Sequence, residues 1–372
     1  MNRRSFIVFS VLTVAVVVAA GVTVVLNRTG DPEKALGKPF PNLIDRVNDI
    51  HKVVLRQEKT SLTLVRAAAG WSLEERNAYP VRPEKVREAV LGLAQLELLE
   101  TKTRQPERYK ALDLEDPETE GARSKLFTLL DKDGAEIAKI VIGKQKLTVG
   151  NSSGVYVRKP GDPQTWLAKG KFNPGTLPME WLDTNIIDIP FARVSSIILR
   201  HPDGETITAS RPSVDVDHLS VSGLPDGAKL KSPHAPDDLA SPFSKLELED
   251  VKKAGEITFD PAKTVRATLK TFDGLTLEAA LIETADNSNW LTLEAKGEKA
   301  ENQEIPGTPG TKVAEESKDN MMDKKGPEAR AWAINDRVAG WVYSIPGYKA
   351  GAFSTRLKDL LEEKKEEKKP GE

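Results

Sequence analysis

Cysteine is absent from this chain of 372 residues. The chain can therefore form no disulfide, has no thiolate nucleophile and offers no cysteine ligand to a metal ion. It also lacks the acylated cysteine of a lipoprotein. Such a composition suits an oxidising compartment, where stray thiols are a liability.

An excess of charge of either sign is also missing. Lys and Arg together number 54, and Asp and Glu together number 56, so the net charge is −2. A nucleic-acid-binding domain normally carries a basic excess. We therefore expect no nucleic-acid partner.

Motifs that carry chemistry are missing as well. The sequence contains no H-E-x-x-H zinc motif, no G-x-S-x-G nucleophile elbow and no complete phosphate-binding loop. The turn at Asp131–Glu136 departs from a calcium loop, since the twelfth position is Ile142. The histidines are scattered, and we interpret them as surface or turn residues. The prediction is that the protein has no catalytic, cofactor-binding or metal-binding residue, and this covers all four histidines: His51, His201, His218 and His234.

One long apolar run is present, from Phe6 to Leu26, and it has no charged residue. At 1.5 Å per residue, about 21 residues span roughly 30 Å, the thickness of a bilayer core. Arg3 and Arg4 precede the run, and the positive-inside rule keeps that end in the cytoplasm. We therefore predict a single-pass membrane anchor over residues 1–28 with a cytoplasmic N-terminus. The lipid bilayer is then one partner, and the later domains are periplasmic.

Two other interpretations of this N-terminus remain open. A cleaved signal peptide has a shorter apolar region that ends at an A-x-A-like site. The segment Arg3–Ile7 also resembles a twin-arginine export signal, although two arginines can simply orient the helix. All these interpretations place the rest of the chain outside the cytoplasm.

The segment after the anchor divides into a Pro/Gly-rich stalk, 29–47, and a first unit, 48–189. Val53–Arg56 and Leu62–Val65 flank a polar turn, which predicts a hairpin. Pro83 opens a predicted helix whose apolar residues recur every three or four positions as far as Leu99. The remaining predicted elements of this unit are a third strand at Gly70–Leu73, a hairpin at Asp133-Gly134, strands at Val155–Arg158 and Gln164–Leu167, and a short helix at Met179–Ile187.

The same order of elements recurs in a second unit, 190–361. Asp-Gly turns at Gly134, Gly204 and Gly274 lie 70 residues apart, and each predicts a hairpin. Strands are also predicted at Ala331–Ile334 and Gly340–Tyr343, before a closing helix at Phe353–Leu361. We therefore predict an α+β fold: an N-terminal transmembrane helix followed by two tandem units of antiparallel sheet plus helix.

Two segments are predicted to lie outside the packed units. Residues 296–330 are rich in Gly, Pro, Glu and Lys, and nearly free of large apolar groups, so we expect a disordered loop. Residues 362–372 form a charged tail. The six tryptophans fall in predicted strands and helices. We expect them to pack in the core, which is a commoner role for tryptophan than an exposed platform for carbohydrate. They are Trp71, Trp166, Trp181, Trp290, Trp332 and Trp341.

Several short motifs resemble a bacterial family of membrane-anchored proteins, domain of unknown function 4340. They are Gly37–Pro41, Gly70–Leu73, Tyr79-Pro80, Tyr109–Leu114, Ile142–Lys144, Val155–Arg158, Gln164–Leu167, Trp181–Asp183 and Trp341–Pro346. The resemblance implies no enzymatic activity. Members of the family are often encoded beside ABC-type permeases similar to gliding-motility exporters.

The leading hypothesis is therefore a non-enzymatic extracytoplasmic accessory subunit of an ABC-type transport or export system, with permease and auxiliary membrane subunits as partners. A cell-envelope protein that binds glycan or peptide is the alternative. A hydrolase whose site is assembled from distant residues is a third, less favoured hypothesis.

Overall fold

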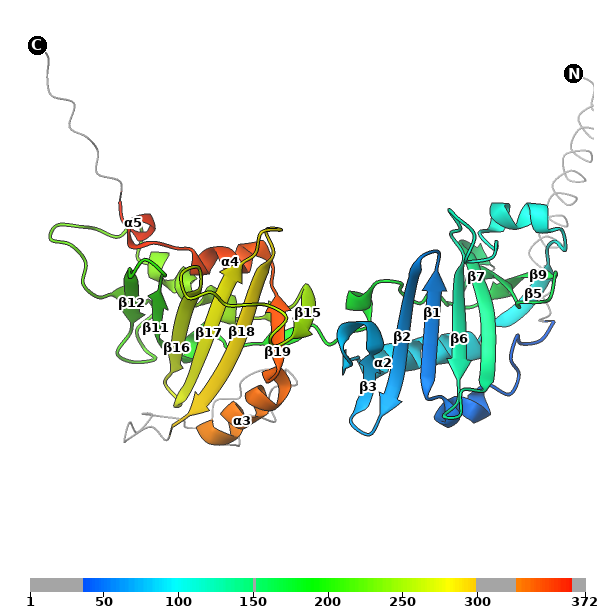
Figure 1. Ribbon diagram of the computed structural model, residues 1–372, viewed down its shortest axis with the longest axis horizontal. Coiled ribbons are helices and arrows are strands. Elements are labelled where there is room, and N and C mark those ends of the chain that lie inside the picture. Colours follow the sequence, from blue (N-terminus) through cyan, green and yellow to red (C-terminus); the bar gives the residue numbers. More distant parts are fainter. Residues whose placement is uncertain (1–35, 150–151, 299–325, 363–372) are drawn as a thin grey trace, which may run out of the picture. The chain divides into compact units, whose positions relative to one another are not determined.

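Antiparallel pairing of strands that are neighbours in sequence dominates the fold (Figure 1). The structure, a computed structural model, describes residues 36–149, 152–298 and 326–362. These residues divide into two units. The first contains the residues up to Glu75 together with Pro80–Trp181, and the second contains Arg76–Tyr79 and the chain from Leu182 onward.

The first unit is built on a nine-stranded sheet with the order β4-β3-β2-β1-β6-β7-β8-β9-β5. In β1, Val53 and Leu55 are buried while their neighbours are not, as expected for a strand with one covered face. The predicted hairpin is confirmed, since Gln57 pairs with Thr60 across the turn. The elements are η1 (Ile44–Asp49), β1 (Lys52–Gln57), β2 (Thr60–Ala67), β3 (Gly70–Leu73), η2 (Glu74–Arg76), β4 (Tyr79–Pro80), α2 (Pro83–Ala94), β5 (Glu97–Thr101), η3 (Pro106–Leu112), β6 (Lys125–Leu130), β7 (Glu136–Val149), β8 (Ser152–Arg158), β9 (Thr165–Lys169) and η4 (Pro178–Glu180).

Helix α2 crosses behind β1, β2 and β6 in Figure 1. Its buried face includes Val86, Val90 and Leu93, at the spacing that the sequence predicts. The helix ends at Ala94, however, and the predicted continuation to Leu99 is wrong. Leu99 lies in β5, where strand alternation buries it equally well.

Aromatic packing closes the core of the first unit. Phe127 of β6 is fully buried and meets Phe172 edge-on, with ring centroids 5.3 Å apart. Nearby, the Trp181 indole N–H donates to the carbonyl oxygen of Gly175 at 2.9 Å. This bond satisfies the polar atom of a tryptophan that is only 3% exposed.

The second unit carries an eight-stranded sheet with the order β13-β12-β11-β16-β17-β18-β19-β15, and a two-stranded sheet of β10 and β14. The Asp-Gly turn between β16 and β17 requires its glycine, because Gly274 has φ +83° and a Cβ there would meet the Glu298 carbonyl oxygen at 2.2 Å. The elements are β10 (Asn185–Ile187), η5 (Phe191–Arg193), β11 (Val194–Arg200), β12 (Thr206–Ser210), β13 (Ser220–Val221), η6 (Ala235–Phe243), β14 (Leu246–Glu247), β15 (Asp250–Lys253), β16 (Val265–Thr271), β17 (Leu275–Glu283), β18 (Asn289–Gly297), α3 (Pro327–Val338), β19 (Trp341–Ser344), α4 (Gly347–Phe353) and α5 (Leu357–Leu360).

Helix α3 replaces the strand that was predicted at Ala331–Ile334. Its buried residues, Arg330, Ala331, Ile334 and Val338, follow helical spacing. The Asn335 side chain bonds both the N–H and the carbonyl of Ala295 at 2.8 Å, which ties α3 to β18. Both ends of the predicted disordered loop, 296–330, are therefore corrected, since β18 extends to Gly297 and α3 begins at Pro327. Its central part, 299–325, lies outside the described residues.

The two other predicted helices are also corrected. In place of a helix at Met179–Ile187, the chain makes the short turn η4 and then the strand β10. The β-branched pair Ile186 and Ile187 favours an extended strand, and both side chains are buried there. The predicted closing helix is split into α4 and α5.

The predicted fold class as a whole is wrong. The described residues form mainly β-sheet, with short helices and 3₁₀ turns, because most apolar positions alternate along strands rather than following helical spacing. None of the helices described is both long and apolar enough to span a bilayer. The predicted transmembrane helix at 1–28 and most of the stalk lie outside the described residues, as does nearly all of the charged tail.

Candidate functional site

A small pocket lies beside α2 in the first unit, with a volume of about 210 Å³. It is lined by Lys85, Glu88, Ala89, Lys171, Phe172, Asn173, Pro174, Gly175, Glu180 and Trp181. Sites for drug-sized ligands usually measure about 300–1,000 Å³. This pocket is therefore of a size to accept one side chain or one small group.

The polar groups around the pocket are largely engaged with one another. The Lys85 ammonium contacts the Glu88 carboxylate at 3.0 Å. Lys125 donates to the Asn173 side chain at 2.9 Å and to the Pro174 carbonyl oxygen at 3.0 Å, and its burial lowers its pKa. These contacts fix the loop that forms one wall of the pocket.

A buried arginine organises the loop that follows β12 in the second unit. Arg211 is 6% exposed and donates to the carbonyl oxygens of Val194, Val216, Phe191 and Ala192 at 2.7–2.9 Å. Its guanidinium also lies over the rings of Phe191 and Phe272. Burial lowers the pKa of Arg211, and the nearby carboxylates of Asp237 and Asp217 oppose that shift.

Beyond this loop, the structure gathers His218, His234 and Asp237. The three side chains offer ligand atoms that all lie within 4.8 Å of one another. His218 Nδ1 lies 2.8 Å from one Asp237 oxygen, and the other oxygen accepts the N–H of Leu219 at 2.8 Å. The two imidazole rings meet edge-on, with centroids 4.2 Å apart. Imidazole and carboxylate are ordinary ligands of transition metals.

Sequence reasoning missed this cluster because it treated the histidines as separate surface residues. The one local indication is the spacing of His234 and Asp237. His234 immediately precedes η6 and Asp237 lies in its first turn, so a single turn brings them together. The approach of His218 depends on the loop held by Arg211, which no short motif reveals.

The other two histidines bond backbone carbonyls. His51 Nδ1 lies 2.9 Å from the Asp49 oxygen. His201, which is 6% exposed, reaches the Thr355 oxygen at 3.0 Å. His201 therefore lies at a turn but is buried, not on the surface.

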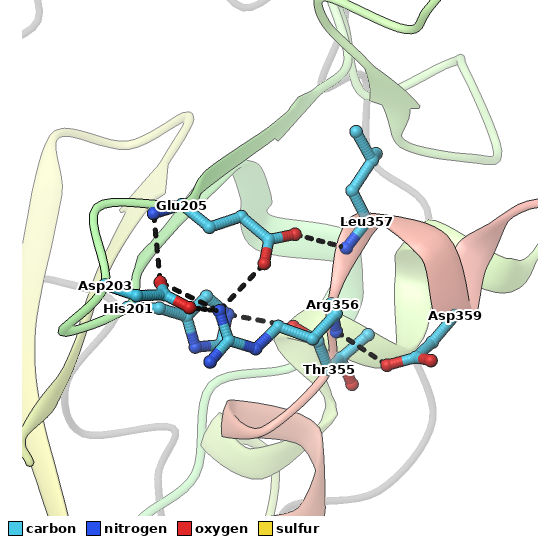
Figure 2. Close-up of polar contacts among 7 residues, drawn as sticks. All are labelled: His201, Asp203, Glu205, Thr355, Arg356, Leu357 and Asp359. Carbon is cyan, nitrogen blue, oxygen red and sulfur yellow. Dashed lines mark hydrogen bonds and ion pairs between the residues drawn. The ribbon is translucent and has the colours of Figure 1, made fainter.

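His201 adjoins a charged network, drawn in Figure 2, that joins the β11–β12 turn to the chain between α4 and α5. Arg356 contacts Asp203 at 2.7 Å and Glu205 at 2.8 Å. The second Glu205 oxygen accepts the N–H of Leu357 at 2.8 Å. The Arg356 contact lowers the pKa of Asp203, and the Leu357 N–H followed by Arg356 lowers the pKa of Glu205. This network explains why the predicted closing helix is interrupted between α4 and α5. The Thr355 carbonyl and the Leu357 N–H bond side chains of the β11–β12 turn instead of helical partners.

A second charged group stands at the β16–β17 turn. The Asp273 carboxylate lies 2.7 Å from Arg193 and 3.2 Å from Arg330, and it accepts the Thr271 hydroxyl. Arg330 also donates to the Asp273 carbonyl oxygen at 2.8 Å. Through Arg330, the Asp273 carboxylate thus joins α3 to the β16–β17 turn.

The tryptophans divide between core and surface. Trp181 and Trp290 are 3% and 4% exposed, which confirms the predicted core role for these two. Trp332 is 69% exposed on α3, so the same prediction is wrong there. Trp71, Trp166 and Trp341 are half-buried.

Comparison with known proteins identifies one family. Residues 71–271 match the model described as "Domain of unknown function (DUF4340)". No curated protein and no solved structure matches this chain. The match confirms the family resemblance seen in the sequence and covers more than half of the 372 residues. The chain therefore belongs to the DUF4340 family.

Proposed function

We propose that this protein is a non-enzymatic accessory subunit of an ABC-type transport or export system. It acts outside the cytoplasm, at the bacterial inner membrane, and binds a permease or auxiliary subunit. The resemblance to this family supports the proposal, since it implies that the protein is encoded beside ABC-type permeases and auxiliary subunits.

The observation that carries the proposal is the pocket of the first unit. Its volume suits a single side chain of a protein partner, and its Lys85–Glu88 pair already neutralises itself. Leu177 lies between two lining residues and is 64% exposed. In this proposal the pocket accepts a side chain of the partner, and Leu177 supplies an apolar contact beside it.

Affinity purification of the full chain from detergent-solubilised membranes of the native bacterium tests this proposal. We expect ABC permease subunits to co-purify with the unaltered protein and to be lost with Leu177→Asp. Lys132→Glu is the matched control, since its side chain is 72% exposed in a hairpin turn away from the pocket residues. Recovery of no permease subunit, or equal recovery with Leu177→Asp, would refute the proposal.

One observation favours a second function, the binding of envelope glycan or peptide. Trp332 presents its ring to solvent, and exposed tryptophans are common platforms for sugars. Titration of soluble cell-wall fragments, followed by tryptophan fluorescence, distinguishes this function. Binding that Trp332→Ala abolishes and Leu147→Ala preserves would favour it, and an unchanged fluorescence would exclude it.

A further inference from the structure

We propose that His218, His234 and Asp237 form a binding site for a divalent transition-metal ion such as Zn²⁺. This inference is independent of the proposed transport role. It assigns a ligand to a cluster in which two imidazoles and one carboxylate already converge.

The present geometry needs little change to accept the ion. His218 Nδ1 and the Asp237 oxygen are 2.8 Å apart, which is hydrogen-bond distance. In a tetrahedral zinc site, with bonds of about 2.0–2.1 Å, two neighbouring ligand atoms lie roughly 3.3 Å apart. Placing Zn²⁺ between these two atoms therefore requires an opening of about half an ångström.

The third ligand is within reach of the same point. His234 is exposed, and its ring lies edge-on to His218 with centroids 4.2 Å apart. A side-chain rotation of this exposed residue brings one ring nitrogen to the ion. Water would fill the remaining coordination position, an arrangement with three protein ligands that zinc commonly adopts.

Surrounding contacts hold the ligands from behind. The second Asp237 oxygen accepts the N–H of Leu219, so the carboxylate keeps its orientation when the first oxygen turns to the ion. The carbonyl oxygen of His234 accepts the N–H of Asp237 at 2.9 Å, which fixes the spacing of these two ligands. Arg211 bonds the carbonyl of Val216, two residues before His218.

The donor set selects the class of metal. Two imidazoles and one carboxylate suit Zn²⁺, Co²⁺ or Ni²⁺, whereas Ca²⁺ and Mg²⁺ prefer sites made of oxygen. The positive charge of Arg211 opposes a cation, but its donors are directed at four backbone carbonyls. The carboxylate of Asp237 offsets part of that repulsion.

Titration of the tag-free full chain with Co²⁺ and with Zn²⁺ tests the site. Co²⁺ should give a visible absorption band that saturates at one equivalent of the ion per chain. Added Zn²⁺ should displace the Co²⁺ and remove the band. His218→Ala, His234→Ala and Asp237→Asn should each weaken binding at least about tenfold. His51→Ala, which removes a histidine of the first unit, should leave binding unchanged.

Because His234 is exposed, His234→Ala keeps the site testable even if another variant fails to fold. Circular dichroism of each variant verifies its fold. Absence of a saturable absorption band would overturn the proposal, and so would binding that all three variants retain. Binding that all three variants retain would mean that the ion binds elsewhere. Absence of the band would mean that the cluster is only the hydrogen-bonded pair His218 and Asp237 with the His234 ring edge-on to it.

Discussion

The two units share one plan but hold their loops in different ways. Both build a wide antiparallel sheet from strands that are neighbours in sequence. In the first unit, the long excursion between β5 and β6 is tied by several separate side chains, such as the Tyr109 hydroxyl on the Pro163 carbonyl oxygen at 2.7 Å and Arg158 on the Leu114 carbonyl oxygen at 3.3 Å. In the second unit, the excursion after β12 is tied by the guanidinium of Arg211.

This difference concerns the hydrogen bonds that the sheets cannot provide. The backbone carbonyls of a loop outside the sheet have no partner strand, and each one that is buried needs another donor. One arginine serves four such carbonyls in the second unit. The same loop delivers His218 to Asp237, so the polar ties of the second unit also create its candidate metal site.

The largest expected effect is in the apolar core of the first unit. Phe127→Ala removes a fully buried ring that packs on Phe172, and should lower the free energy of unfolding by about 4 kcal/mol. Urea denaturation followed by circular dichroism measures this loss. An effect below about 1 kcal/mol would show that the aromatic pair does not organise this core.

The next largest effect should come from the buried arginine of the second unit. Arg211→Met retains much of the side-chain volume but leaves four carbonyls without their donor, at a cost of about 3 kcal/mol. Arg211→Lys should restore only part of the stability, because an ammonium cannot reproduce the planar fork. If thermal denaturation shows that Met is tolerated as well as Arg, the contrast between the units fails.

A smaller effect is expected at the β16–β17 turn. Asp273→Asn weakens the contacts to Arg193 and Arg330, and should cost about 2 kcal/mol. Denaturation in urea at low and high salt measures it. Since Arg330 is largely buried, we expect added salt to mask little of the loss.

The smallest effect is expected at Glu205, and it should depend on pH. The folded-state pKa of Glu205 lies below its ordinary value of 4.5, because the Leu357 N–H and Arg356 bond its carboxylate. Its stabilising contribution is therefore present above pH 4.5 and is lost as the pH falls through the lower, folded-state pKa. Glu205→Gln should lower Tm at neutral pH, and the difference from the unaltered protein should vanish in acid. A difference that persists in acid would contradict this assignment.

Strands with strict alternation were predictable from the sequence. The β1–β2 hairpin agrees with the prediction, because burial on one face fixes a two-residue period. Short apolar runs were not predictable in the same way. Leu99 satisfies both a helical and a strand pattern, and only the ladder between β5 and β9 decides between them.

The candidate metal site was beyond prediction for a related reason. Its residues come from a loop and from a 3₁₀ turn, where no periodicity applies. Their approach depends on Arg211, whose partners are carbonyls up to 20 residues distant in the chain. Every residue has a backbone carbonyl, so the amino-acid sequence does not indicate which carbonyls Arg211 binds.

The most direct test of this account is hydrogen exchange of the full chain, measured by mass spectrometry with and without Zn²⁺. We predict slower exchange in peptides that contain Leu219 and Asp237, whose N–H groups bond within the cluster, and no change in peptides of the first unit. Unchanged exchange around both residues, or protection confined to the first unit, would contradict the claim that the polar ties of the second unit form a metal site.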